Sequence, residues 1–536
     1  MGNTSHRSSA SSLDTPNTQP KALCGTMQNN GGFRLALLTA DGQCPRWMWE
    51  PLQAAVGDGR MTLAVVAGVF GLAKPSHPWI LEAYARWERG RYLSPDSLLQ
   101  DVDVAARSGE TVLSFGVHEI EQLATRLANC RADVLLVTPG ADQAILDAIG
   151  IPSWKFQFGA SERQHNAPGL WEVVEQSLSS ISLVETSPAS GSPRVLETIV
   201  GRTDPRSWIR NELGLAAKAS DLLRRWVPPQ TFRTQRLAPD FSSEACSQNG
   251  AGREPSLAVM GLLVRFGRHA VTATINVGQW QLAVDTTQDY RRLSSPEILT
   301  PPVDRFWCDP FLVQRDGVLH LFVEECLYES GRGHIAMLSR SSTGKWSQPS
   351  TVLERPYHLS YPFVFKHEGE LLMLPETTAA GRVELYRCIR FPDQWDFDTV
   401  LVDNFAGADA TLWFQDERWW MFVEFRDELH ILYSDSPRGP WHPHRGNPVK
   451  SDSRSSRPAG RIFRMGKYVV RPAQDCSIQY GREVVFNKIT RLTICDFEEV
   501  EIGRLQTPWG SNTGCHTFSQ LDGITLADRF VNRRRW

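Results

Sequence analysis

The C-terminal half of the chain repeats one short segment five times, and each copy starts with a residue suited to acid–base or binding chemistry. These first residues are Asp309, Tyr361, Asp409, Arg457 and His516. Charged side chains are rarely buried unless they are paired or functional. If the positions converge, two carboxyl groups, a phenol, a guanidinium and an imidazole share one pocket that could move protons and hold an anion. An Asp–Arg pair that merely closes a channel is the structural alternative.

The spacing of the copies indicates a repeated structural unit. Their first residues are 52, 48, 48 and 59 positions apart, and each copy runs about eight residues to an expected turn. The expected turn residues are Gly317, Gly369, Glu417, Gly466 and Gly523. Further apolar strands follow in most units, and a tryptophan opens a fourth strand in three of them. Four strands in each ~50-residue unit, five times over, are typical of an all-β five-bladed propeller.

The propeller architecture predicts a central funnel and a closed ring. The innermost strand of each blade starts at the funnel, so the five first residues should lie there. A glutamate recurs seven residues beyond the turn in three units, at Glu324, Glu376 and Glu424. The last unit is short of strands because the chain ends soon after Arg529. An open ring would expose a strand edge, so we expect Gly278–Asp285 to pair with the last blade.

The N-terminal part predicts a different, α/β domain. Short apolar runs alternate with stretches whose apolar residues recur at helical spacing, such as Ile120, Leu123 and Leu127. Strands are expected at Phe33–Ala40, Thr62–Ala67, Thr111–Phe115, Asp133–Thr138 and Trp154–Phe158. This alternation predicts a mostly parallel, Rossmann-like sheet. The sequence has no glycine-rich dinucleotide or phosphate-loop motif, so nothing in it predicts an NAD or ATP site.

Length sets the expected domain organisation. A chain of 536 residues is too long for one hydrophobic core. The multidomain order that we expect is a disordered tail at 1–31, the α/β domain at 32–226, a linker at 227–256 and the propeller at 257–536. The linker assignment rests on its content of Pro, Ser, Gly and Asn, which break any regular period.

The composition limits which binding partners and which cellular compartment we expect. The net charge of −3 gives no field that would gather phosphate backbones, so nucleic acid is not an expected partner. The longest apolar run, Met61–Ala73, is shorter than the ~20 residues of a membrane-spanning helix. The ten cysteines form no C-x-x-C pair and no export signal is visible, so we expect a cytoplasmic protein. Its 18 tryptophans and 24 phenylalanines could build sugar-stacking surfaces, although most such residues pack in cores.

The segment Ala132–Glu172, with "ADVLLVTPGADQAILDAIGIPSWKFQFG" followed by "APGLWEVVEQ", resembles the formyltransferases. That family uses an Asn-x-His pair at the end of a strand and a later Asp in a D-x-G turn. The resemblance places Lys155 and Gln157 at the Asn and His positions and Ala189 at the Asp position. A glutamine cannot take a proton near neutral pH, so we expect formyl transfer to be lost. His165, eight residues beyond Gln157, is the one candidate for a replacement base.

The repeats resemble two families of sugar-active proteins through "FWCDPF", "LSYPFVF", "LPET", "SRPAG", "RPAQDCSIQYG" and "GCHTF". One is the five-bladed propeller of family 43 glycoside hydrolases, and a closer one is the propeller part of plant glucosamine inositolphosphorylceramide transferase and its bacterial relatives. The glycosidase resemblance implies that Asp309 is a general base. It puts Tyr361 where a pKa-tuning Asp is expected and Asp409 where the acid is expected. Inverting hydrolysis needs one protonated and one ionised carboxyl group. Asp309 could form such a pair with Asp409 or with Glu376.

The remaining candidate residues concern substrate binding. Arg457 could hold a phosphate by its bidentate fork, as a transferase or phosphorylase would need. The "RPAQDCSIQYG" segment adds Arg471, Asp475 and Tyr480, which we expect at the pocket rim, although Asp475 could equally stabilise a turn. No cofactor is expected. Some relatives hold a calcium ion beside a histidine in the channel, which makes His516 a possible ligand, but one histidine is not a metal site.

Three functions are compatible with these patterns. The first is a glycan- or glycolipid-processing transferase or glycosidase-like enzyme of surface polysaccharide assembly, acting on a sugar, nucleotide sugar or glycan at the funnel. It predicts that Asp309 and Asp409 face one funnel within about 10 Å. The second is a sugar-amine N-formyltransferase whose propeller recruits the substrate. The third is a non-catalytic glycan-binding protein, which a mutually satisfied Asp–Arg network would favour.

Overall fold

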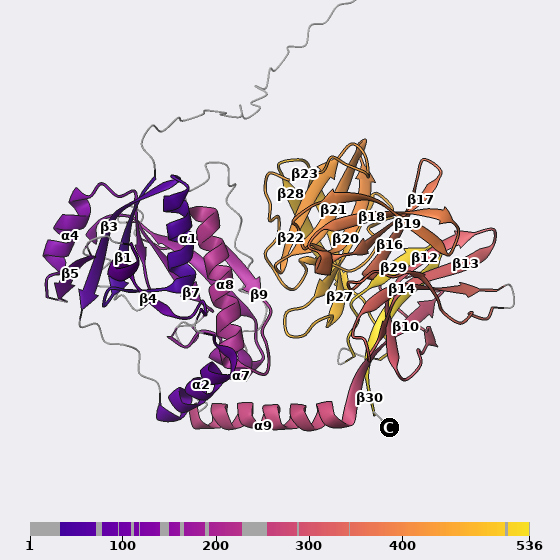
Figure 1. Cartoon of the computed structure of the whole chain (residues 1–536), viewed down its shortest axis with the longest axis horizontal. Helices are drawn as coiled ribbons and strands as arrows, with labels where there is room; N and C mark the ends of the chain where they lie inside the picture. Colours follow the sequence, from indigo (N-terminus) through magenta and orange to yellow (C-terminus); the bar gives the residue numbers. More distant parts are fainter. Residues whose placement is uncertain are drawn as a thin grey trace, which may run out of the picture.

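The computed structural model shows an α/β domain beside a β-propeller (Figure 1). The residues that it describes are 33–70, 78–94, 96–108, 112–116, 118–139, 149–160, 164, 166–187, 192–227, 255–286, 289–341, 344–509 and 513–534. Within these ranges no helix combines the length and the apolar character needed to cross a membrane. The expected tail at 1–31 lies outside the described residues.

Nine strands form the sheet of the α/β domain, in the order β4-β2-β1-β6-β7-β8-β9, with β3 paired to β1 and β5. The strands are β1 (Phe33–Ala40), β2 (Gln43–Pro45), β3 (Met61–Phe70), β4 (Asp101–Asp103), β5 (Val112–Gly116), β6 (Val134–Val137), β7 (Ser153–Phe158), β8 (Ser179–Thr186) and β9 (Arg194–Gly201). The helices are α1 (Arg46–Gly57), α2 (Trp79–Tyr92), α3 (Val104–Ser108), α4 (Ile120–Asn129), α7 (Leu170–Glu175) and α8 (Trp208–Trp226). The five strands expected from the sequence are confirmed as β1, β3, β5, β6 and β7.

The sheet is mixed, whereas the sequence pattern predicted a mostly parallel one. Strands β5, β3, β1, β6 and β7 pair in parallel, as expected for a Rossmann-like core. Strands β8 and β9 extend the sheet in antiparallel fashion, as do β2 and β4. The link between β8 and β9 is short, and parallel strands need a crossover of a dozen or more residues. A short link therefore dictates the antiparallel pairing.

Helices cover both faces of this sheet and bury its core. On one face α1 and α8 bury Trp47, Leu215 and Leu222. On the other face α4 buries Leu123 and Leu127, which confirms the helix expected from their spacing. Each helix presents one apolar stripe to the sheet, as an amphipathic helix in a layered domain must.

Helix α9 (Pro255–Ile275) leads into the propeller. Most of the expected linker, 227–256, falls on residues 228–254, which are outside the described part of the chain. The first propeller strand begins at Asn276. The start of the segment assigned to the propeller, 257–536, is therefore helical.

The propeller has five sheets, and the blades are numbered here by their order after β11. Blade 1 holds β12 (Arg305–Arg315), β13 (Val318–Leu327), β14 (Gly333–Arg340) and β15 (Ser350–Leu353). Blade 2 holds β16 (Ser360–His367), β17 (Glu370–Glu376), β18 (Val383–Arg390) and β19 (Gln394–Val402). Blade 3 holds β20 (Ala408–Gln415), β21 (Arg418–Phe425), β22 (Glu428–Ser434) and β23 (His442–Pro443). Blade 4 holds β24 (Arg457–Pro458), β25 (Phe463–Met465), β26 (Tyr468–Asp475), β27 (Glu483–Leu492) and β28 (Phe497–Arg504).

Blade 5 closes the ring with strands from both ends of the propeller. It holds β29 (Phe518–Leu521), β30 (Ile524–Arg534), β10 (Asn276–Asp285) and β11 (Glu297–Leu299). β10 pairs with β30 over its whole length, with Trp280 opposite Phe530. The two rings lie 5.2 Å apart in an edge-on contact. The predicted closure by Gly278–Asp285 is confirmed, and it leaves no open strand edge at the seam.

A bulge aims one residue of each of the first three blades inward. Asp309, Tyr361 and Asp409 have φ of 52°, 46° and 52°. The strand register shifts at each of these positions, between Cys308 and Phe311 in blade 1 and at the equivalent places in blades 2 and 3. A left-handed residue costs about 1–2 kcal/mol when it is not glycine. The same strained conformation in three blades indicates that the direction of these side chains is what the bulge provides.

The α/β domain docks on blades 3 and 4 through its last strand and helix. The Val200 amide donates to the Ser451 carbonyl at 2.9 Å, and the Ser453 amide donates to the Val200 carbonyl at 2.9 Å. Arg225 of α8 reaches across to Glu428 of blade 3, with 2.7 Å between Nη1 and Oε1. Backbone bonds and a largely buried ion pair therefore fix the orientation of the two domains.

The blade 3 turn allows a test of the repeat assignment. Glu417 has a φ of 58° where blade 1 has Gly317 with a φ of 76°. Glycine adopts this conformation without a Cβ clash, so Glu417→Gly should raise the free energy of unfolding by about 0.5–1 kcal/mol. The reciprocal variant, Gly317→Ala, should lower it by about 1 kcal/mol. Urea unfolding of both variants measures this, and shifts of the same sign would contradict the equivalence of the two turns.

Candidate functional site

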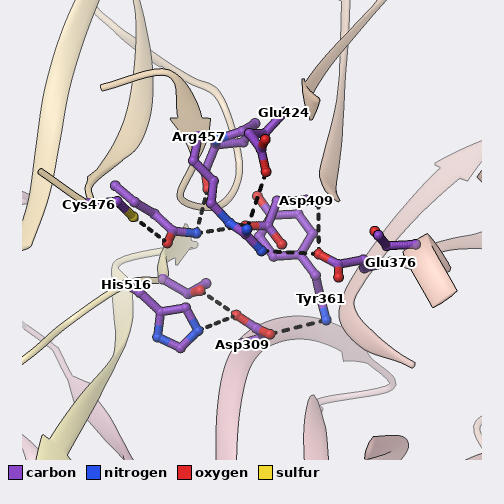
Figure 2. A network of polar contacts seen from close by, with 12 residues as sticks. Asp309, Tyr361, Glu376, Asp409, Glu424, Arg457, Cys476 and His516 are labelled. Atoms are coloured by element: carbon purple, nitrogen blue, oxygen red, sulfur yellow. Dashed lines mark hydrogen bonds and ion pairs between the residues drawn. The ribbon is translucent and has the colours of Figure 1, made fainter. Parts of the chain in front are cut away.

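Arg457 is the centre of a polar network in the propeller funnel (Figure 2). Its guanidinium donates from Nε to Asp409 at 2.6 Å, from Nη2 to Glu376 at 3.2 Å and from Nη1 to Glu424 at 3.3 Å. The three carboxyl groups belong to blades 2 and 3, and the arginine starts blade 4. Gln474 adds a 2.6 Å hydrogen bond to the same oxygen of Asp409. One cation thus holds together side chains of three blades.

A second group surrounds Asp309 at the seam between blades 1 and 5. Thr517 donates to Oδ1 of Asp309 at 2.5 Å, and the Tyr361 amide donates to Oδ2 at 3.2 Å. His516 lies between two carboxylates, with Nε2 3.2 Å from Asp309 and Nδ1 2.9 Å from Asp528. All of these side chains are buried. The imidazole is therefore held in place from both sides.

Tyr361 joins the two groups. Its amide contacts Asp309, and its hydroxyl lies 2.7 Å from Thr411 and accepts a 2.6 Å hydrogen bond from the Gly460 amide. The five first residues of the repeats are thus brought into one funnel, as the repeat pattern predicted. The expected separation of about 10 Å between Asp309 and Asp409 stays a prediction.

The two groups shift the pKa values of their carboxyl groups in opposite directions. Burial alone would raise the pKa of Asp309, but the His516 cation and the hydrogen bonds of Thr517 outweigh it, and the pKa is lowered. Burial and the neighbouring Asp409 carboxylate raise the pKa of Glu376 well above its usual value, against the opposing effect of Arg457. These shifts favour the ionised form of Asp309 and the protonated form of Glu376. Environments that push two pKa values apart are how acid and base roles are divided.

The side chains differ in how far a ligand can reach them. Tyr480 is 41% exposed, and its ring centre lies 5.2 Å from the Arg457 guanidinium. The side chains of Arg457 and Glu376 are 22% and 14% exposed, whereas that of Asp309 is 4% exposed. A ligand would first meet Tyr480, Arg457 and Glu376, and Asp309 lies beneath them.

Two predicted binding residues belong to other networks. Arg471 is fully buried and donates to both carboxylate oxygens of Glu499, at 2.8 and 2.6 Å. Asp475 accepts hydrogen bonds from Ser477 and pairs with Arg504 at 3.1 Å. The Ser477 contact is a local turn, which is the alternative role that the sequence left open for Asp475. Neither residue has a described contact with the funnel groups.

Several members of the network were not among the predicted site residues. They are Glu424, Gln474, Thr517 and Asp528. Glu424 could have been found, because it occupies the same repeat position as Glu376. Thr517 directly follows His516, but nothing in the sequence indicates that its side chain contacts blade 1. Asp528 lies on β30, where nothing in the sequence distinguishes it from a solvent-facing residue.

The α/β domain offers no proton acceptor at the position that the formyltransferase resemblance marks. Lys155 and Gln157 lie on β7, opposite Val184 and Ser182 of β8. His165, the one candidate replacement, and the turn at 189–191 are outside the described residues. The loss of formyl transfer therefore remains a prediction.

A calcium ion does not fit the funnel residues. Within the described part of the chain, Cys308, Asp309 and His516 offer ligand atoms within 4.8 Å of one another. Calcium takes roughly six to eight oxygen ligands, whereas this set has one carboxylate oxygen, a thiol and an imidazole. Burial raises the pKa of the Cys308 thiol, and the adjacent carboxylates raise that of His516. Both shifts favour the protonated forms, which do not bind a metal.

The propeller matches a known family. Residues 299–513 match the family described as "Glucosamine inositolphosphorylceramide transferase 1, N-terminal". Glucosamine inositolphosphorylceramide transferase 1 of Oryza sativa subsp. indica is 38% identical over 208 residues, and that of Arabidopsis thaliana is 32% identical over the same length. The predicted resemblance of the propeller to this transferase is confirmed.

The match covers a part of each protein. It takes in 37% of this chain and 28% of the rice protein. The chain therefore spans about a quarter of the length of the curated relatives it matches, and their transferase activity does not follow from the match alone.

Solved glycoside hydrolases show a more distant likeness. A family 117 glycoside hydrolase of Zobellia galactanivorans is 12% identical, with a TM-score of 0.33, over 48% of this chain and 90% of its own. An exo-1,5-α-L-arabinanase from a bovine ruminal metagenomic library is 14% identical, with a TM-score of 0.29, over 43% of this chain and 94% of its own. Similarities of this size give no information about the chemistry of the funnel.

The environment of His516 predicts a pH dependence of stability. Burial lowers the pKa of His516, but Asp528 and Asp309 together raise it well above 6.5. A raised pKa stabilises the fold below the unfolded value of ~6.5 and loses that stability as the pH rises through the folded value. Above pH ~6.5 the free energy of unfolding should fall by up to about 1.4 kcal/mol per pH unit from this group.

Urea unfolding between pH 6 and pH 9 measures this contribution. His516→Gln should show a shallower decline than the unaltered protein, and the matched control His442→Gln, at an exposed position on β23, should keep the full decline. Parallel pH profiles for the unaltered protein and His516→Gln would show that the histidine is not held as a cation.

Proposed function

We propose that the protein is a carbohydrate-active enzyme of glycan or glycolipid processing, and that it works at the propeller funnel. The observation that carries the proposal is that Glu376, held by Arg457, and Asp309, held by His516 and Thr517, lie in one funnel with their pKa values shifted in opposite directions. The match of this propeller to proteins named glucosamine inositolphosphorylceramide transferase supports a sugar or glycolipid substrate.

The exposed part of the funnel is suited to binding a sugar. Tyr480 presents a half-exposed aromatic ring beside Arg457. Aromatic rings pack on the apolar face of a sugar, and charged side chains hydrogen-bond its hydroxyl groups. Glu376 lies on the same guanidinium, so a sugar stacked on Tyr480 would meet its carboxyl group.

The two carboxyl groups divide the proton transfers of a glycosyl transfer. Glu376 gives its proton to the leaving oxygen as the glycosidic bond breaks. The incoming hydroxyl group or water forms the new bond to the anomeric carbon and gives its proton to Asp309. Before Asp309 can accept this proton, its hydrogen bond from Thr517 must break. The Thr517 hydroxyl group can rotate away, whereas the Tyr361 amide is fixed. Asp409 is left to hold Arg457 in position.

A non-catalytic glycan-binding protein is the second candidate, and one observation favours it. Asp409 and Arg457 satisfy each other, and Gln474 supplies a further donor to Asp409. Such a closed Asp–Arg network is what the binding function predicted. The two candidates share the sugar site and differ in whether Glu376 passes on its proton.

Replacement of Glu376 separates the two functions. Glu376→Gln removes the acid but keeps an amide for Arg457 and the Asp409 backbone, so turnover of an amino-sugar glycan should fall about 100-fold or more with binding retained. The rate of the unaltered protein should also fall as the pH rises through the raised pKa of Glu376. Mass spectrometry of the products and calorimetry of glycan binding measure the two effects.

The control is Glu368→Gln, an exposed glutamate of the same blade. It should leave both turnover and binding unchanged. If the unaltered protein binds a glycan without forming any product, and Tyr480→Ala abolishes this binding, the protein is a glycan-binding protein and not an enzyme.

A further inference from the structure

A cavity of about 560 Å³ lies between the two domains. Its α/β wall is helix α8, at Gly214, Ala217 and Ser220, whose small side chains leave the space open. Its propeller wall is the end of β21 and the turn that follows, at Glu424 and Asp427. Figure 1 shows α8 and β9 on the side of the α/β domain that faces the propeller. The volume is within the range of pockets that hold small organic ligands.

Five cations and four carboxyl groups line this cavity. The cations that line it are Arg202, Arg210, Lys218, Arg224 and Arg426. Asp221 is shared by two of them, at 3.1 Å from Arg224 and 3.3 Å from Arg426. Asp204 is likewise shared by Arg206 and Arg210. The lining therefore carries more positive charge than its carboxylates balance.

Arg202 is a lining cation without a direct ion pair in the described part of the chain, although its charge helps Lys218 to lower the pKa of Asp427. It follows β9, one residue before the Thr203 amide that bonds to the Ser477 carbonyl of the propeller at 2.8 Å. Its backbone is thus fixed at the domain interface while its side chain is exposed and lines the cavity. A guanidinium with free donors binds a phosphate through two parallel hydrogen bonds.

Glu424 connects the cavity to the funnel. It lines the cavity, and its Oε2 lies 3.3 Å from Nη1 of Arg457. Its other oxygen accepts a 2.5 Å hydrogen bond from the Asp427 amide. The Asp427 carboxylate in turn lies 2.8 Å from Nζ of Lys218 on α8. A single residue therefore borders both spaces, and a chain of contacts runs from the α/β domain to the funnel arginine.

We propose that this cavity binds the phosphate of a phosphorylated sugar, with Arg202 as its principal ligand, and that the attached sugar enters the funnel past Glu424. The shared chemistry is a phosphate ester linked to a sugar, as in a sugar 1-phosphate or a sugar nucleotide. The statement that the sugar enters the funnel rests on the proposed function. The phosphate site rests only on the cavity and its cations.

Calorimetry on the full chain tests the phosphate site. The probes are inorganic pyrophosphate, N-acetylglucosamine 1-phosphate, UDP-N-acetylglucosamine and uncharged N-acetylglucosamine. Arg202→Gln should weaken the three phosphate-bearing probes about 10-fold or more and leave the uncharged sugar unchanged. Arg194→Gln, at the exposed arginine that begins β9 and does not line the cavity, should change none of them. The sugar 1-phosphate and the nucleotide arms show which source of phosphate the cavity prefers.

The outcomes separate this inference from the proposed function. Affinities for pyrophosphate that are equal in the unaltered protein and Arg202→Gln, or no pyrophosphate binding at all, overturn the phosphate site. Loss of pyrophosphate binding in Arg202→Gln without any binding of the uncharged sugar supports the phosphate site and counts against the funnel as a sugar site. Arg202 is exposed and has no direct ion pair, so a thermal melt of Arg202→Gln should lie close to that of the unaltered protein.

Discussion

The pairing of Arg457 with three carboxyl groups is the interaction on which the funnel depends. Taking charges out of water is costly, and removal of one member of a buried set leaves the others uncompensated. Arg457 meets Asp409, Glu376 and Glu424, so its fixed fork sets the relative position of blades 2, 3 and 4 at the centre of the ring. Burial and the neighbouring Asp409 carboxylate raise the pKa of Glu376 against the effect of Arg457, because one guanidinium is shared by three carboxyl groups.

The bulges and the domain interface act on this same centre. The left-handed residues of blades 1, 2 and 3 turn Asp309, Tyr361 and Asp409 toward it at a cost in backbone strain. The α/β domain is linked to it through Lys218 of α8, which pairs with Asp427, whose amide donates to Glu424. Helix α8 of this domain thus forms one wall of the cavity that the propeller also lines.

The sequence predicted the repeats well because they depend on local signals. Period, turn residues and the first residue of each copy are all readable along the chain, and the closure by β10 follows from the need to pair a free edge. Contacts between blades are different, since Thr517 and Asp528 of blade 5 reach Asp309 of blade 1 only through the curvature of the ring. The antiparallel strands β8 and β9 and the cavity beside α8 likewise depend on how elements pack in three dimensions, which no single segment encodes.

The most direct test of the funnel as the sugar site is a crystal structure of the full chain soaked with a short amino-sugar glycan. We predict that a sugar ring lies against the face of Tyr480 and that the hydroxyl groups of the sugar contact Arg457 and Glu376. A glycan bound in the α/β domain beside Gln157, with the funnel network unchanged, would contradict it.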